Sequence, residues 1–280
     1  MILSGAASQG LGARLAGALD EELGAVEFDE FPDGEQIVRI PDRVDGRVVV
    51  VASTVSDSAH IQLLQLQDAA REAGATEIVT VIPYLGYARQ DKAFTAGEPV
   101  SVRAVARAVS TGADHVVTVN PHQSAVMEYF DVPTTTVDGA GRLAEPLPSL
   151  TDPVFLAPDE NAHSVAASVR DAYGTGSVDY FEKDRDHETG TVDIHPHETA
   201  VTDRDVVIVD DIVATGSTMS EAIAHLESPR RVFVGCVHPL LAGNAWTRLA
   251  RAGVETVYGT DTIESAVSSV SVAPAIAATL

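Results

Sequence analysis

Short apolar runs alternate with longer amphipathic stretches along the 280 residues of the chain. The runs predict strands buried on both faces, because such strands carry apolar side chains without alternation. They are 48–52, 77–82, 115–120, 154–157, 206–209, 232–237 and 255–258. Alanine-rich stretches with helical spacing separate several of them, at 61–75, 100–112 and 244–253. This alternation predicts an α/β fold with mainly parallel sheets flanked by helices.

A stretch rich in glycine and proline, 139–149, interrupts this alternation near the middle of the chain. Such stretches often mark boundaries between domains. We therefore expect two small α/β domains of similar length, 1–140 and 141–280. The chain is long enough for each half to bury a core of its own.

The segment VVIVDDIVATGST, 206–218, carries the strongest functional signal. Its apolar start predicts a buried parallel strand, which places Asp210 and Asp211 at the carboxyl end, where open α/β sheets bind ligands. The small residues from Ala214 to Thr218 then open a predicted helix, whose first N–H groups can bind an anion, and Gly216 lets the backbone approach it closely. The segment predicts a phosphorylated sugar as ligand, with carboxylates for the hydroxyls and the loop for the phosphate. A solvated Asp-Asp turn is the simpler alternative.

Charge narrows the classes of partner. The chain has 41 acidic and 18 basic residues, a formal charge of −23, and nucleic acids and anionic membranes bind basic patches instead. The acids are dispersed, which suits a protein kept soluble in concentrated salt, where repulsion is screened. Only Lys92 and Lys183 are lysines, and such a lysine-poor, acidic chain resembles the proteins of halophiles.

Two further observations concern location. No run approaches the roughly 18 apolar residues of a membrane span, and the N-terminus lacks the pattern of a signal peptide. Cys236 is the single cysteine and lies in an apolar run. We expect it to pack in the core of a protein in the reducing cytoplasm.

Three motifs in the first half follow predicted strands or turns. FPDGE, from Phe31 to Glu35, is a turn signal with two carboxylates around a glycine, and on its own it favours a hairpin connection. Arg89 and Gln90 belong to YLGYARQDK, which follows a strand and also contains one of the two lysines. An arginine there can grip a phosphate through two N–H groups. His122 follows a third strand, although a lone histidine is more often structural.

The second half adds two more candidates. Asp159 follows the strand at 154–157, where a carboxylate could hold Mg²⁺ directly or through water. Lys183 and Arg185 are separated by one residue, so both project to one side if the segment is extended. They suggest a loop that closes over a polyphosphate, although a surface loop would also fit. His187, His195 and His197 invite a zinc hypothesis, which no cysteine or regular histidine spacing supports.

Taken in order, FPDGE, YARQDK, the histidine of VNPHQ, the aspartate of APDEN, K-x-R and VDDIVATGST resemble the motifs of ribose-phosphate diphosphokinases (PRPP synthetases). The resemblance extends over essentially the whole chain. The length of the chain and the sequences of its loops are most similar to those of archaeal members. It implies two phosphoribosyltransferase-like domains. It also implies transfer of the diphosphoryl group of Mg-ATP to the C1 hydroxyl of ribose 5-phosphate, giving PRPP and AMP for nucleotide biosynthesis.

The resemblance also implies a role for each motif residue. Lys183 and Arg185 would be catalytic, and His122 and Asp159 would lie at the Mg²⁺ site. ATP would contact the first half, in part from a neighbouring subunit of a homo-oligomer, through Phe31, Asp33, Gly34, Glu35, Arg89 and Gln90. Ribose 5-phosphate would contact Arg185, Asp210, Asp211, Ala214, Thr215, Gly216, Ser217 and Thr218.

The chain departs from the family pattern at two positions. Asn120 and Ala214 stand where many members have acids, so the contacts that those acids make are absent. Two other functions compete with PRPP synthesis. A phosphoribosyltransferase that consumes PRPP would leave FPDGE and YARQDK without a role. A non-catalytic regulatory subunit would be expected to lose the catalytic residues, which are all present.

Overall fold

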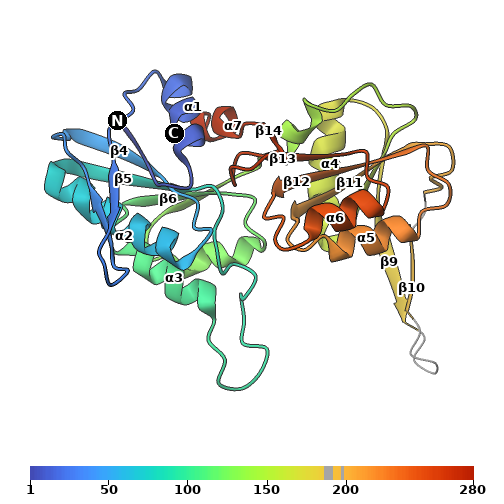
Figure 1. Cartoon of the computed structure of the whole chain (residues 1–280), viewed down its shortest axis with the longest axis horizontal. Coiled ribbons are helices and arrows are strands. Elements are labelled where there is room, and N and C mark those ends of the chain that lie inside the picture. Colours follow the sequence, from blue (N-terminus) through green and yellow to red (C-terminus); the bar gives the residue numbers. More distant parts are fainter. Residues whose placement is uncertain (186–191, 197–198) are drawn as a thin grey trace. The chain divides into compact units, whose positions relative to one another are not determined.

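The computed structural model describes residues 1–185, 192–196 and 199–280. The chain forms two compact units (Figure 1). The first contains Met1–Asp138, Asp261–Glu264 and Ser271–Leu280, and the second contains Gly139–Thr260 and Ser265–Val270. The sequence places all of 141–280 in the second half, whereas in the structure the last ten residues pack with the first unit.

The first unit is built on a five-stranded parallel sheet in the order β1-β4-β5-β6-β7. A separate antiparallel hairpin, β2–β3, precedes β4. The strands are β1 (Ile2–Ser4), β2 (Glu27–Glu30), β3 (Gln36–Arg39), β4 (Gly46–Val51), β5 (Ala75–Ile82), β6 (His115–Val119) and β7 (Thr134–Val137). The helices are α1 (Gln9–Leu19), α2 (Asp57–Ala73), α3 (Ser101–Ser110), the 3-10 helix η1 (Ser124–Tyr129) and α7 (Ala273–Ala277).

The second unit has a seven-stranded sheet in the order β10-β9-β8-β11-β12-β13-β14, antiparallel only between β9 and β10. Its strands are β8 (Val154–Ala157), β9 (Ser177–Arg185), β10 (Val192–Pro196), β11 (Asp205–Ile212), β12 (Arg231–His238), β13 (Thr256–Thr260) and β14 (Ser268–Val270). Its helices are α4 (His163–Tyr173), α5 (Ser217–Ala224), α6 (Ala245–Arg251) and the 3-10 helices η2 (Ala140–Ala144) and η3 (Glu160–Ala162).

The apolar runs form the strands that the sequence predicts. The valines of β4 and the apolar residues 206–209 of β11 are all buried, as expected for parallel strands covered on both faces. Helix α2 begins earlier than its alanine-rich pattern, because the Ser56 hydroxyl accepts a hydrogen bond from the Ala59 N–H and caps its first turn. Cys236 is fully buried in β12, as predicted, and burial raises the pKa of its thiol.

The end of the chain returns to the first unit and is fixed there. Helix α7 lies against α1 (Figure 1). Asp261 is buried, pairs with Arg14 at 3.0 Å and accepts a hydrogen bond from the Val272 N–H at 2.8 Å. Glu264 accepts a bond from the Leu11 N–H at 2.9 Å, so it caps the first turn of α1. These contacts make the C-terminal residues part of the first unit's framework.

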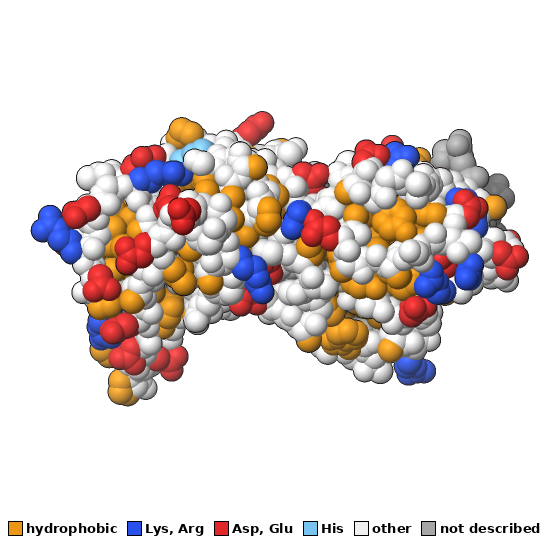
Figure 2. All heavy atoms as spheres, turned by 90° about the horizontal axis from the view of Figure 1, so that it is seen from above, with side chains coloured by type: hydrophobic (Ala, Val, Ile, Leu, Met, Phe, Trp, Pro, Cys, Tyr) orange, Lys and Arg blue, Asp and Glu red, His pale blue; other side chains and the backbone are white. Residues whose placement is uncertain are grey.

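The surface agrees with the acidic composition. On the face shown in Figure 2, acidic side chains are scattered among basic and apolar ones. Within the part of the chain that the structure describes, no helix combines the length and apolarity needed to cross a membrane.

Candidate active site

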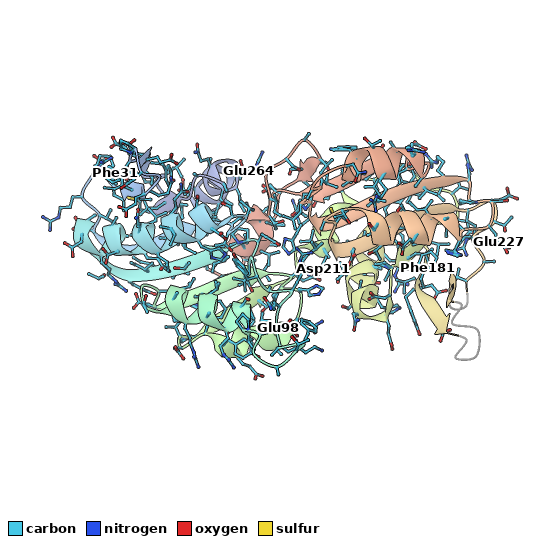
Figure 3. The ribbon with its side chains drawn as sticks, turned by 60° about the horizontal axis from the view of Figure 1, so that its bottom comes forward. Phe31, Glu98, Phe181, Asp211, Glu227 and Glu264 are labelled. Atoms are coloured by element: carbon cyan, nitrogen blue, oxygen red, sulfur yellow. The ribbon has the colours of Figure 1, made fainter. Side chains whose placement is uncertain are left out.

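The second unit gathers three carboxylates at one edge of its sheet. Asp210 and Asp211 lie at the carboxyl end of β11, just before its last residue (Asp211 is labelled in Figure 3), and Asp159 follows β8 by two residues. Strands β8 and β11 are parallel neighbours, with Leu156 opposite Ile208, so their carboxyl ends share an edge. Asp159 is further fixed as the cap of η3, where its Oδ1 accepts bonds from the Asn161 and Ala162 N–H groups.

The two other acids perturb Asp210. Burial raises the pKa of Asp210 well above its ordinary value, and the charges of Asp211 and Asp159 raise it further. The Asp211 N–H donates to Asp210 Oδ1 at 2.9 Å, which offsets only part of that effect. A cluster whose charged form is disfavoured in the free protein gains from a cation or from hydroxyl donors. The edge is therefore suited to a polyhydroxylated or metal-bound ligand.

The loop after the acid pair ends in helix α5. Gly216 has a φ of 70°, in the left-handed region that favours glycine, and precedes the first helical residue, Ser217. A Cβ at this position would lie 3.3 Å from Leu249 Cγ, so the missing side chain also allows α6 to pack on the loop. The hydroxyls of Thr215 and Ser217 lie 3.0 Å apart. The result is a helix start with two hydroxyls beside it, which can bind an anion.

Lys183 and Arg185 lie in β9, an extended segment paired with β10. Lys183 is opposite Ile194 and Arg185 opposite Val192. The sequence suggested a loop, whereas the structure has a strand that continues past its parallel pairing with β8, which ends at Tyr180. His187 and His197 lie outside the described residues, and only the backbone of His195 is described. Among the described residues, no three His, Cys, Asp or Glu side chains form a metal-binding group.

The first unit carries the YARQDK residues in the loop that follows β5. Tyr87 has a φ of 63°, and its hydroxyl donates to Asp57 Oδ1 at 2.6 Å. Arg89 is exposed, while Gln90 Oε1 accepts a hydrogen bond from the Ser101 hydroxyl at the start of α3. The loop is thus anchored to α2 and α3, with Arg89 left facing solvent.

FPDGE forms the turn of the β2–β3 hairpin, as its turn signal predicts. The Phe31 N–H donates to the Glu35 carbonyl, the Glu35 N–H donates to Asp33 Oδ1, and Gly34 has a φ of 91°. All five residues are exposed, and Phe31 (labelled in Figure 3) is 44% exposed. The hairpin therefore presents an aromatic ring and two carboxylates outward.

His122 follows β6 and is exposed. Asn120 before it has a φ of 35°, which asparagine tolerates better than most residues. Its side-chain amide donates to Asp138 Oδ1 at 2.9 Å. Asn120 therefore acts as a donor where an acid would only accept.

Known proteins resemble the chain along its whole length. The N-terminal domain of ribose phosphate pyrophosphokinase matches residues 1–112, and the phosphoribosyl transferase domain matches residues 138–272. Ribose-phosphate pyrophosphokinase from Halobacterium salinarum is 64% identical over 99% of both chains. The protein of the same name from Methanopyrus kandleri is 45% identical over 95% of this chain and 94% of its own. The chain belongs to the ribose-phosphate pyrophosphokinase family.

A solved structure supports the same assignment. The crystal structure of phosphoribosylpyrophosphate synthetase from Mycobacterium smegmatis matches with a TM-score of 0.82 and 26% identity, over 100% of this chain and 96% of that one. The predicted fold of two phosphoribosyltransferase-like domains is therefore confirmed. The halobacterial and methanogen relatives also agree with the archaeal, halophile-like character expected from the sequence.

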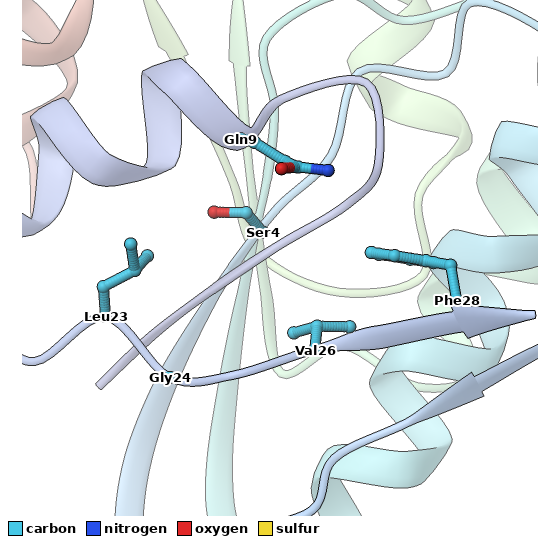
Figure 4. A pocket seen from close by; sticks show the side chains of 6 residues that line it. All are labelled: Ser4, Gln9, Leu23, Gly24, Val26 and Phe28. Atoms are coloured by element: carbon cyan, nitrogen blue, oxygen red, sulfur yellow. The ribbon is translucent and has the colours of Figure 1, made fainter.

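One cavity lies apart from the motif residues. It has a volume of about 130 Å³ and is lined by six residues of the first unit (Figure 4). They are Ser4, Gln9, Leu23, Gly24, Val26 and Phe28. None of them belongs to the motifs described above.

Sequence reasoning missed two residues that contact the motifs of the ribose-phosphate pyrophosphokinase family. Asp57 holds Tyr87 of YARQDK from the first turn of α2, and Arg248 donates from α6 to Ser217 of the anion loop. Neither belongs to a recognisable motif. Their only signal in the sequence is a charge on an otherwise ordinary helix, which is too common to identify a site.

Proposed function

We propose that the protein transfers the diphosphoryl group of Mg-ATP to the C1 hydroxyl of ribose 5-phosphate, giving PRPP and AMP. The observation that carries this proposal is the acid pair and anion loop at the end of β11, in a full-length member of this family. Relatives named ribose-phosphate pyrophosphokinase support the same reaction. The product would feed nucleotide biosynthesis.

The sugar phosphate is proposed to bind in the second unit. Asp210 and Asp211 would accept hydrogen bonds from ribose hydroxyls. Such bonds stabilise the charged form of each carboxylate, which the neighbouring acid disfavours. The 5-phosphate would bind the loop at 214–218 through backbone N–H groups and the hydroxyls of Thr215, Ser217 and Thr218. The family's frequent acid is alanine at 214, so that position would contribute its backbone alone.

ATP is proposed to bind residues of the first unit. Arg89 faces solvent and makes no ion pair with any described residue, so its guanidinium is available for phosphate. Gln90 would contact the nucleotide beside it. Phe31, with Asp33, Gly34 and Glu35, would contact the base or ribose of ATP bound to a neighbouring subunit of a homo-oligomer. The outward position of the hairpin turn supports this, because its own unit leaves the ring exposed.

Lys183 and Arg185 are proposed as the catalytic residues. Transfer of a phosphoryl or diphosphoryl group depends mainly on positioning and on cations that neutralise developing charge. The two residues lie one residue apart in an extended backbone that continues beyond the parallel part of the sheet. Arg185 would also contact ribose 5-phosphate.

Magnesium is proposed as the cofactor, with Asp159 and His122 at its site. Mg²⁺ usually takes one or two carboxylates and completes its shell with water and substrate phosphates. The described residues fit this pattern, since they offer oxygen ligands at the end of β8 without a complete protein cage. Bound Mg²⁺ would neutralise the triphosphate. Because it prefers oxygen, His122 would contact a phosphate or a metal-bound water.

One assay tests the proposal. Purified protein is incubated with ribose 5-phosphate, ATP and Mg²⁺ across a range of salt concentrations, and AMP is measured. AMP and PRPP formed in equal amounts are the expected result. Consumption of PRPP with a purine or pyrimidine base would instead indicate a phosphoribosyltransferase. No AMP at any salt concentration would indicate a non-catalytic subunit.

The reducing cytoplasm is the proposed location, in keeping with a single buried cysteine.

A further inference from the structure

The segment that joins β12 to α6 runs beside the anion loop. The Leu241 N–H donates to the Val213 carbonyl at 3.0 Å, and the Ala242 N–H donates to the Ala214 carbonyl at 2.8 Å. Helix α6 begins three residues later. These two backbone bonds tie the start of α6 to the residues that precede the helix start of α5.

Packing then fixes which face of α6 meets the loop. Leu249 is fully buried, and the space where Gly216 would carry a Cβ is filled by its side chain. The neighbouring residue, Arg248, donates from Nη1 to the Ser217 hydroxyl. Ser217 is the first residue of α5 and lies 3.0 Å, hydroxyl to hydroxyl, from Thr215. Arg248 is therefore held against the part of the loop proposed to bind phosphate.

The charge of Arg248 is not neutralised within the described chain. Arg248 is half-buried, yet it forms no ion pair with any carboxylate that the structure describes. In a chain whose acids outnumber its bases more than twofold, most arginines are expected to pair with a carboxylate. The structure describes six other half-buried arginines. Five of them pair with a carboxylate: Arg71, Arg142, Arg170, Arg204 and Arg231. The sixth, Arg47, donates to the main-chain oxygen of the C-terminal residue. An unneutralised, partly desolvated guanidinium attracts an anion more strongly than an exposed one.

We infer that Arg248 is a positioning residue for the phosphate of the sugar substrate, acting through Ser217. Because the Ser217 oxygen accepts a bond from Arg248, its own hydrogen is free to point to another acceptor, either Thr215 or a bound phosphate. The positive charge behind the hydroxyl also favours a phosphomonoester in a loop that directly follows two carboxylates. This inference rests on the proposed function, in which that loop holds the 5-phosphate.

The test compares Arg248→Gln with Arg251→Gln, a matched control that removes the same charge from the last, exposed residue of α6. The KM values for ribose 5-phosphate and for ATP are measured, and ribose 5-phosphate binding is followed by calorimetry. Arg248→Gln should raise the KM and Kd for ribose 5-phosphate about tenfold to a hundredfold, because charge-assisted bonds are strong. The KM for ATP should change less than about twofold, and Arg251→Gln should match the wild type.

Two further variants separate positioning from packing. Arg248→Lys keeps the charge without the planar fork and should recover part of the loss. Ser217→Ala should raise the same KM, and the double variant should cost little more than the worse single one, because both changes break one interaction. The effect of Arg248→Gln should also shrink as salt increases. Thermal unfolding of each variant reports whether the fold is intact.

Several results would overturn the inference. They are equal effects of Arg248→Gln and Arg251→Gln, equal increases in the KM for both substrates, or additive losses in the double variant. Wild-type protein that makes AMP while Arg248→Gln keeps the wild-type KM would refute the role of Arg248 but not the proposed function. Wild-type protein that binds ribose 5-phosphate without making AMP would refute the function and leave Arg248 to be judged by calorimetry. Wild-type protein that binds no ribose 5-phosphate would refute both.

Discussion

Replacing Asp205 by asparagine should destabilise the second unit strongly. Asp205 is the first residue of β11 and is fully buried, yet it carries a charge. Its oxygens accept two bonds from Arg231, at 3.0 Å from Nε and 2.6 Å from Nη2. Its Oδ2 also accepts the Thr151 N–H at 2.6 Å. The carboxylate thus joins β11 to β12 and to the segment before β8.

The size of the loss follows from burial. Removing one partner of a fully buried ion pair costs about 3 to 5 kcal/mol, mostly because the remaining charge stays desolvated. The Arg231 side chain is 26% exposed and keeps part of its hydration, so we expect about 2 to 4 kcal/mol. Asp152→Asn is the matched control. Asp152 pairs with Arg204 at 2.9 Å but is 69% exposed, and such a pair contributes about 1 kcal/mol or less.

The pH dependence gives a second, independent test. The hydrogen bond from Arg231 is the largest cause that lowers the pKa of Asp205. A carboxyl whose folded pKa lies below its unfolded value of about 3.9 stabilises the fold fully above that pH. The contribution is lost as the pH falls through the folded pKa. The difference between the wild type and Asp205→Asn should therefore be largest near neutral pH and should shrink below about pH 4.

Urea unfolding followed by circular dichroism, at one fixed salt concentration and at pH 7 and pH 3, measures both effects. Equal losses for Asp205→Asn and Asp152→Asn at pH 7 would refute the argument from burial. A loss for Asp205→Asn that did not change between the two pH values would refute the argument from the carboxylate's charge.

Three other substitutions test the remaining features. Lys183→Ala should reduce turnover by about a hundredfold or more, measured as AMP formation, and near-normal turnover would contradict a catalytic role. Asp210→Asn should raise the melting temperature at neutral pH while reducing activity, because it removes a partly buried charge that disfavours the fold above the raised pKa of this carboxyl; a lower melting temperature would contradict this. Glu264→Ala should cost about 1 kcal/mol by removing the cap at the Leu11 N–H, measured by urea unfolding, and no loss would exclude that contribution.

The sequence predicts well those elements whose environment is uniform along the chain. Strand β11 is buried on both faces, so its residues 206–209 are all apolar. This unbroken apolar run leads directly to Asp210 and Asp211 in the sequence. The turn of the β2–β3 hairpin is equally readable, since FPDGE is a turn signal and forms that turn, with a positive φ at Gly34. In both cases the local sequence and the local structure agree.

Elements that are stabilised by residues distant in the chain are harder to predict from the sequence. The segment at Lys183 is polar and was expected to be a loop, but pairing with β10 makes it a strand. Asp261 and Glu264 fix the chain's end to α1 across more than 240 residues of sequence, through single contacts to Arg14 and the Leu11 N–H. Periodicity carries no information on such contacts, because each involves one side chain and not a repeating face.

Arg248 shows most clearly what cannot be predicted from the sequence. Its sequence environment, AWTRLAR, is that of any amphipathic helix. What distinguishes Arg248 is that its guanidinium contacts a hydroxyl and no carboxylate that the structure describes. This contact depends on where α6 packs, because Leu249 fills the space beside Gly216 and so brings the guanidinium to Ser217. In a chain this acidic, an arginine beside a surface carboxylate is the common outcome and carries little meaning. A half-buried arginine that contacts only a hydroxyl leaves its charge for an anion that the chain itself does not supply.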